Sequence, residues 1–117
     1  MANDYHEPVE YLNQHDRNII RALNSLKEEI EAVDWYHQRV AASNDNEIRE
    51  IMKHNAIEEM EHAMMLLEWL RRNMYGWEDQ MRTYLFTEGN ILEIEEEGGE
   101  ESSSEGSSKS GLGIGEL

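Results

Sequence analysis

The sequence contains no cysteine, which excludes a disulfide framework and a thiolate metal site. Any metal bound by this chain must therefore be held by carboxylate and imidazole groups. Basic residues are also scarce, with 10 Lys and Arg against 26 Asp and Glu, and the formal net charge is -16. Nucleic acids and anionic membranes select for clusters of basic residues, so both are excluded as partners, and cations become the natural small partners.

Long apolar runs are missing as well, since no segment approaches the roughly twenty residues of a membrane span. Residues 1–15 lack the basic and apolar regions of a signal peptide, and we predict a soluble, cytoplasmic chain. The 117 residues allow one small domain. A low-complexity tail leaves roughly ninety residues for the fold, a size at which a lone chain buries only a marginal core. Partner subunits would relieve that shortage.

The pattern of apolar residues predicts an all-α fold. A first helix is expected from about Pro8, a residue suited to the first helical position, to about Ala42. Apolar residues recur there every seven positions, as in a helix packed in a bundle: Leu12, Ile19, Leu26, Val33 and Val40.

A second helix is expected over about 46–74, after a cluster of turn residues. Glu47 lies three places after Asn44, which resembles a capping box. This helix carries two apolar seams, and an antiparallel two-helix hairpin cannot cover both by itself. A short third helix is predicted over about 77–88, ended by Gly89.

The composition divides the chain into three parts. Residues 1–94 form the predicted helical domain. Residues 95–110, rich in Glu, Gly and Ser, lack the apolar surface that ordering a chain requires, and we expect a flexible acidic linker. Residues 111–117 become apolar again and are typical of a tethered docking peptide.

Three polar residues fall on the apolar seams. Glu29 lies between seam positions of the first helix, and the pair Glu59 and His62, at helical i to i+3 spacing, shares one face of the second. An unpaired buried carboxylate costs several kcal/mol and must be neutralised by a proton, a cation or a metal. The seam of the second helix has no Lys or Arg. A metal site is therefore one hypothesis, and a polar layer in which Glu29 hydrogen-bonds His62 or Tyr36 is the other.

The number of candidate ligands predicts a dimer. In ferritin-like di-iron proteins a four-helix bundle supplies one Glu from each of two helices and a Glu-x-x-His from each of the other two. This chain holds half of that set. A complete site would need two copies facing each other.

Four motifs together resemble the encapsulated ferritins, and the resemblance covers most of the chain. They are the segment EEIEAVDWY (28–36), the segment EEMEH (58–62), the segment LEWLRRN (67–73) and the segment RTYLFTEG (82–89). Encapsulated ferritins are bacterial and archaeal ferroxidases that lie inside encapsulin shells. The tail residues Leu112, Gly113, Ile114 and Gly115, followed by Leu117, resemble the cargo-loading peptide that docks on the shell, although relatives often carry Ser-Leu and a basic residue where this chain ends in Glu116-Leu117.

The resemblance implies a two-helix protomer that pairs into a ferritin-like four-helix bundle, with dimers assembling into a ring-shaped decamer. By this resemblance Glu29, Glu59 and His62 are the iron ligands, contributed by both subunits. Trp35 and Tyr36 border the site. Glu28 and Glu31 resemble the place where metal enters.

The implied function is oxidation of Fe(II) by dioxygen at a di-iron centre, with storage left to the encapsulin nanocompartment. Zinc, calcium or manganese can occupy such a site in place of iron. Two alternatives remain: a redox-silent acidic metal-binding protein or iron chaperone, and a structural helical cargo protein.

Overall fold

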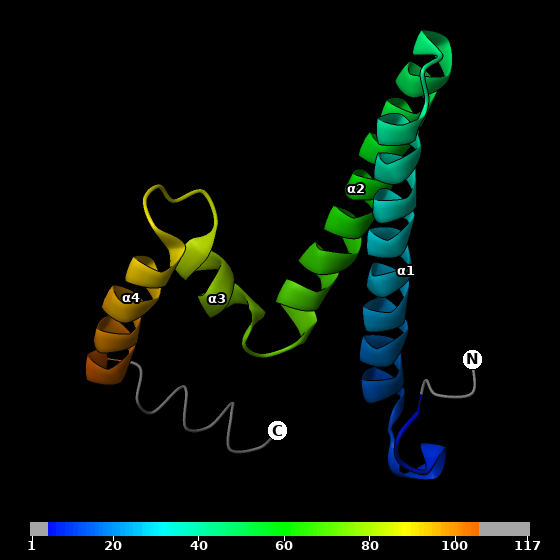
Figure 1. Cartoon of the computed structure of the whole chain (residues 1–117). Coiled ribbons are helices and arrows are strands. Elements are labelled where there is room, and N and C mark those ends of the chain that lie inside the picture. The colour runs from blue at the N-terminus through cyan, green and yellow to red at the C-terminus, as the bar shows by residue number, and fades with distance from the viewer. Residues whose placement is uncertain (1–4, 106–117) are drawn as a thin grey trace. The chain divides into compact units, whose positions relative to one another are not determined.

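The computed structural model describes residues 5–105, and all regular structure within this range is helical. The chain divides into two units, the first ending at Asn73 and the second beginning at Met74. The first holds the hairpin of two long helices and the second holds two shorter helices (Figure 1). None of the helices in this range has the length and apolar character that crossing a membrane requires.

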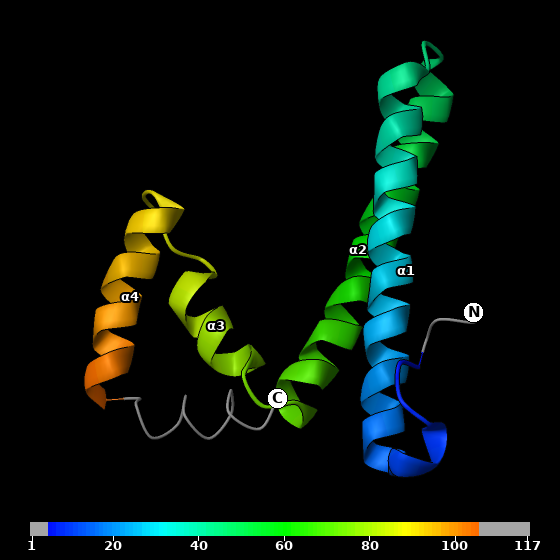
Figure 2. The same cartoon turned by 60° about the horizontal axis from the view of Figure 1, so that its bottom comes forward.

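Helices α1 (Gln14–Ala42) and α2 (Asn46–Asn73) run antiparallel and pack against each other in both views (Figures 1 and 2). The predicted all-α class and antiparallel hairpin are thereby confirmed. Only three residues join the helices. The carboxylate of Asp45 accepts a hydrogen bond of 2.9 Å from the amide of Ile48, so Asp45 caps α2 and the predicted capping by Asn44 is wrong.

Helix α1 begins six residues later than predicted. Pro8 starts a short 3-10 turn, η1 (Val9–Tyr11), and the chain then becomes extended at Leu12. The side chain of Asn13 accepts a hydrogen bond of 2.7 Å from the amide of Asp16, which is the N-cap interaction of α1. The side chain of Asn13 accepts a hydrogen bond from an amide in the first turn that has no partner within the helix, whereas Pro8 has no side-chain acceptor. The helix therefore begins at the later residue.

Small side chains form the contact between α1 and α2. The buried apolar residues of the described range are Ala22, Ala56, Ala63 and Leu70. At the open end of the hairpin, Nε2 of His15 lies 3.2 Å from the carbonyl oxygen of Asn73 and ties α1 to the last turn of α2. Many large apolar side chains stay outside this contact, among them Ile30, Ile48, Ile51, Ile57, Met60, Met64 and Met65.

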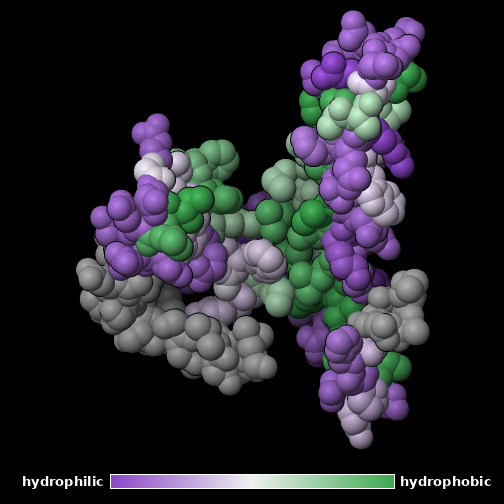
Figure 3. Space-filling model, viewed as in Figure 1, coloured by the Kyte–Doolittle hydropathy of each residue, from purple (hydrophilic) through white to green (hydrophobic). Residues whose placement is uncertain are grey.

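The prediction that one hairpin cannot cover its own apolar seams is therefore confirmed. In the view of Figure 3, apolar side chains gather over α2 while α1 is mostly hydrophilic. Exposed apolar surface of this kind marks sites of association.

In the second unit, α3 (Trp77–Tyr84) is shorter than the predicted 77–88. The hydroxyl of Thr87 donates a hydrogen bond of 2.6 Å to the carbonyl of Tyr84, and Phe86 has a positive φ of 61°. Both features end the helix before Gly89. The side-chain hydrogen bond of Thr87 competes with the backbone hydrogen bonds of the next helical turn. The spacing of apolar residues gives no information about such a bond.

Helix α4 (Ile91–Glu105) occupies part of the segment predicted to be a linker. Its N-terminus is capped by Asn90, whose side chain accepts hydrogen bonds from the amides of Leu92 and Glu93 at 2.9 and 3.2 Å. Glu is a strong helix former and is favourable in the first turn, so the acidic residues from Glu93 to Glu97 support the first half of this helix. Residues 106–110 of the predicted linker and the predicted docking peptide 111–117 lie outside the described range.

Candidate metal centre

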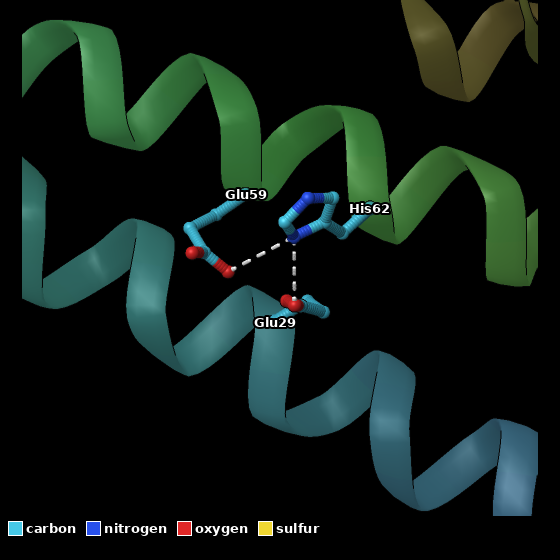
Figure 4. A group of neighbouring side chains, drawn as sticks. All are labelled: Glu29, Glu59 and His62. Carbon is cyan, nitrogen blue, oxygen red and sulfur yellow. Dashed lines mark hydrogen bonds and ion pairs between the residues drawn. The ribbon is translucent and has the colours of Figure 1, made fainter.

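Glu29 on α1 meets Glu59 and His62 on α2 midway along the hairpin (Figure 4). Nδ1 of His62 lies 3.2 Å from Oε1 of Glu29 and 3.6 Å from Oε2 of Glu59. One ligand atom from each of the three residues lies within 4.8 Å of the others. Two bonds of about 2.0–2.6 Å to a single ion span distances of this size.

The sequence predicted that Glu29 lies on the seam of the first helix and that Glu59 and His62 lie on a seam of the second, and the structure brings the three side chains together. Among the residues that the structure describes, they are the only group of three or more His, Asp and Glu side chains placed to hold one ion. Their roles as ligands stay a prediction.

The three side chains are open to solvent on one side. The carboxylates of Glu29 and Glu59 are 20% and 24% exposed, whereas the imidazole of His62 is 47% exposed. A single hairpin therefore presents the three donors on its surface and does not enclose them. An ion bound here by one chain would keep several positions open for water or for further ligands.

The electrostatics of the group reflect two carboxylates crowded beside one imidazole. Hydrogen bonding with Glu29 raises the pKa of Glu59, with partial desolvation and the charge of Glu29 acting in the same direction. For His62, desolvation by itself would lower the pKa, but the hydrogen bond to Glu29 and the charges of both carboxylates outweigh it, so the pKa is raised. Both shifts favour the protonated forms of these groups, with which a bound cation would compete.

The alternative of a polar layer is present in the same geometry, because Glu29 and His62 are hydrogen-bonded to each other. Among the residues that the structure describes, the second carboxylate, Glu59, has only the same His62 as a cationic partner, at 3.6 Å. Two carboxylates for one imidazole leave an excess of negative charge, which a bound cation would neutralise. The donor set of carboxylate oxygen and imidazole nitrogen suits iron, manganese and zinc.

The other sequence-predicted site residues lie outside this triad. Glu28 and Glu31 are exposed and belong to no ligand cluster in the described range. Trp35 is 49% exposed and lines a shallow hollow with Gln38, Arg39 and Ala42. Tyr36, half-buried two turns after Glu29, has the guanidinium of Arg39 over its ring at 5.2 Å from the centroid.

One strong ion-pair network was not predicted. Glu68 accepts two hydrogen bonds of 2.8 Å from Arg71 and a third of 2.7 Å from Arg72, and these arginines lower the pKa of Glu68 to about 2. The signal was available in the sequence, since Glu followed by Arg at i+3 and i+4 forms such pairs on a helix.

Comparison with known proteins places the chain in a family. The sequence profile of the EncFtn-like family matches residues 4–88. A protein of Thermotoga maritima named "Ferritin-like protein" is 66% identical over 97 residues, which is 83% of this chain and 85% of the relative. A protein of Rhodospirillum rubrum named "Encapsulated ferritin-like protein" is 56% identical over 94 residues, or 80% of this chain and 67% of the relative.

A solved structure agrees with both relatives. The crystal structure of a protein from Nitrosomonas europaea is 47% identical in sequence and superposes with a TM-score of 0.71, covering 76% of this chain and 99% of that one. The match of the family profile to well over half of the residues, together with these relatives, shows that the chain belongs to the EncFtn-like family, the encapsulated ferritins.

Proposed function

We propose that this protein is a ferroxidase that oxidises Fe(II) with dioxygen at a di-iron site shared by two copies of the chain. The observation that carries the proposal is the meeting of Glu29, Glu59 and His62 on an exposed face of the hairpin. Membership of the encapsulated ferritins supports it. Iron here is the substrate, and the protein supplies the ligands that hold it.

The number of ligands requires the second copy. Three donors per chain are too few to hold two ions, whereas six donors from two chains equal the set that a ferritin-like bundle provides. The partial exposure of all three side chains leaves room for the facing copy. A two-fold axis through this face would place both triads around the same pair of ions.

Each group has a distinct role in the proposed reaction. The carboxylates of Glu29 and Glu59 neutralise the charge of the ions and favour the Fe(III) product, because hard oxygen ligands prefer the harder ion. The imidazole nitrogen of His62 maintains affinity for Fe(II). Two ions held about 3.5–4 Å apart each give one electron to the same dioxygen molecule. Trp35 and Tyr36 are proposed to border the completed site, and Glu28 and Glu31 to collect cations outside it.

Two exposed apolar flanks of α2 support assembly beyond a dimer. At about 100° per residue, Ile48 and Ile51 lie within about 40° of His62 around the helix, on the flank of the triad. A second flank, made of Ile57, Met60 and Met64, lies on the opposite side of α2. A chain with two separate association surfaces forms rings or filaments, and we propose the closed form, a ring-shaped decamer built from dimers.

The family also supports a location. The Rhodospirillum rubrum relative is named as encapsulated. We propose that this protein is cargo of a cytoplasmic encapsulin nanocompartment, with residues 111–117 docking on the shell. Oxidation would then belong to this protein and storage to the shell.

The test is oxygen consumption after addition of Fe(II) to the full chain, with Fe(III) formation followed by absorbance. We expect rapid, oxygen-dependent oxidation that is greatly slowed in Glu59→Ala. Glu50→Ala is the matched control, because Glu50 is an exposed carboxylate on the same helix whose only described partner is Lys53 at 3.5 Å. Metal uptake without oxygen consumption would instead identify a redox-silent iron chaperone.

The shell assignment has a separate test. A chain that ends at residue 110 should oxidise Fe(II) at the full rate but fail to co-purify with a co-produced shell protein. Normal loading of the truncated chain would contradict the docking role of residues 111–117.

A further inference from the structure

Four large apolar side chains gather around the turn between α3 and α4 in the second unit (Figure 1). Two of them follow α3 and two begin α4, and we call them the turn patch: Leu85, Phe86, Ile91 and Leu92. Their exposed fractions range from 49% at Leu85 to 103% at Phe86. The second unit therefore leaves a continuous stretch of apolar surface uncovered at one end of its helix pair.

Phe86 is the least expected residue of the turn patch. Its φ of 61° lies in the left-handed region, which Gly adopts freely and a bulky side chain adopts only against a steric cost. The side chain is fully exposed, so it gains no burial among the described residues that would offset this cost. A residue that is both strained and uncovered indicates a binding role for its ring.

The segment that follows α4 is long enough to reach the turn patch. Twelve residues, 106–117, come after Glu105, where α4 ends. The helix rises about 21 Å between Ile91 and Glu105. Twelve extended residues span at most about 40 Å, so this segment can return along the whole of α4. Its large apolar residues come last, at Leu112, Ile114 and Leu117.

The charges of this segment and of α4 are complementary. Lys109 is the only Lys or Arg beyond residue 82, and residues 93–97 of α4 include four exposed Glu side chains. An extended chain covers about 10 Å from Lys109 to Leu112. Helix α4 rises about 9 Å from Glu97 back to Ile91. A segment that pairs Lys109 with the acidic side of α4 therefore brings Leu112 level with the turn patch.

We propose that the turn patch binds residues 111–117 of its own chain, with Leu112, Ile114 and Leu117 covering Phe86 and its neighbours. A tether this short keeps the segment near the patch at an effective concentration on the order of millimolar, so weak individual contacts suffice. The inference does not depend on the proposed iron chemistry. It gives residues 111–117 a partner besides the proposed shell, and the two partners would compete for the same apolar side chains.

A photo-reactive residue at position 86 tests this contact in the full chain, produced without any shell protein. Phe86 is replaced by p-benzoylphenylalanine, which keeps an aromatic ring in the turn patch, and the assembled protein is irradiated. Trypsin cleaves after Arg82 and Lys109, so residues 83–109 and 110–117 are separate peptides unless a cross-link joins them. The matched control carries the same photo-reactive residue in place of Tyr11, which is 79% exposed on the η1 turn.

Mass spectrometry should show peptide 83–109 joined to peptide 110–117, with a yield several-fold above that of the Tyr11 control. A mixed assembly separates contacts within a chain from contacts between copies. There the photo-reactive chain ends at residue 110 and is co-produced with an unmodified full chain, and we expect several-fold fewer cross-links to residues 111–117. An equal yield in the mixed assembly would show that a neighbouring copy occupies the patch. That result, or a yield no higher than from Tyr11, would overturn the inference.

Amide exchange of residues 111–117 gives a second readout that needs no photo-reactive residue. Phe86→Ser and Lys109→Glu should each speed this exchange several-fold, whereas Lys109→Arg, which keeps the charge, should leave it unchanged. Exchange in α1 and α2 reports whether each variant keeps the fold. Exchange of residues 111–117 that is as fast in the wild type as in Phe86→Ser and Lys109→Glu would overturn the inference.

Discussion

Replacement of Glu29 by Gln is the most demanding test of the metal centre. Gln keeps the size of the side chain but removes the negative charge that faces His62 at 3.2 Å. Loss of a group that merely supports a metal ligand typically costs 10–100-fold in affinity or activity. A symmetric site loses two direct ligands at once, so Fe(II) oxidation should fall by at least about 100-fold relative to the wild type.

Mixed assemblies measure how many chains build one site. Wild-type and Glu29→Gln chains are co-produced at known ratios, and native mass spectrometry gives the composition of the assemblies. If every site needs two intact chains, the rate follows the square of the wild-type fraction. At equal amounts about one quarter of the wild-type rate should remain, as expected for a two-fold interface. A linear dependence, with half of the rate remaining, would refute the shared site.

The metal-free protein supplies a second readout of the same variant. Because Glu29 contributes to the raised pKa of His62, NMR titration should show a lower pKa for His62 in Glu29→Gln than in the wild type. The wild-type imidazole thus stabilises the fold below its ordinary pKa, and this contribution is lost as pH rises through the raised value. A wild-type rate of iron oxidation together with an unchanged His62 titration would refute both roles of Glu29.

Three further predictions concern the fold. The lowered pKa of Glu68 stabilises the native state above about pH 4.5, and this contribution is lost as pH falls toward about 2. The difference in melting temperature between wild type and Glu68→Gln should therefore shrink over that pH range. An equal difference at all pH values would contradict this role of Glu68. Urea unfolding should show that Asp45→Ala lowers the free energy of unfolding by about 1 kcal/mol, while Asn44→Ala leaves it nearly unchanged. A larger loss in Asn44→Ala than in Asp45→Ala would instead support Asn44 as the N-cap. A Cβ at Gly98 would lie 2.9 Å from the methyl group of Thr83, so Gly98→Ala should increase amide exchange in α4 despite the higher helix propensity of Ala. Adding Thr83→Ser, which removes that methyl group, should reverse the effect. Unchanged exchange in Gly98→Ala would show that α4 does not pack against Thr83.

The sequence by itself determined the features that depend on neighbouring residues along one helix. The spacing of Glu59 and His62 puts both on one face wherever α2 lies, because helical periodicity is local. The same holds for the apolar stripe of α1 and for the turn after Ala42. The absence of cysteine, a property of composition alone, limits the possible metal ligands to carboxylate and imidazole.

Competition between local hydrogen bonds decided the ends of the helices. Asn13 and Asp45 cap α1 and α2, where the sequence had predicted a start at Pro8 and a cap at Asn44. Thr87 ends α3 before the predicted residue. Periodicity of apolar residues carries no information about such contacts. The acidic segment after Ile94 has a composition typical of a linker, but its Glu residues have a helix propensity that favours α4, and the sequence alone did not show which of the two would prevail.

Only the tertiary structure decided that Glu29 meets Glu59 and His62. Residues 33 positions apart come within 3.2 Å because α1 and α2 pack in one register, which the small side chains Ala22, Ala56 and Ala63 fix by allowing the helix axes to approach. A shift of one turn would move Glu29 about 5 Å along the pair and separate the donors. The same packing leaves large apolar side chains uncovered, since two helices in contact can bury only the sides that face each other.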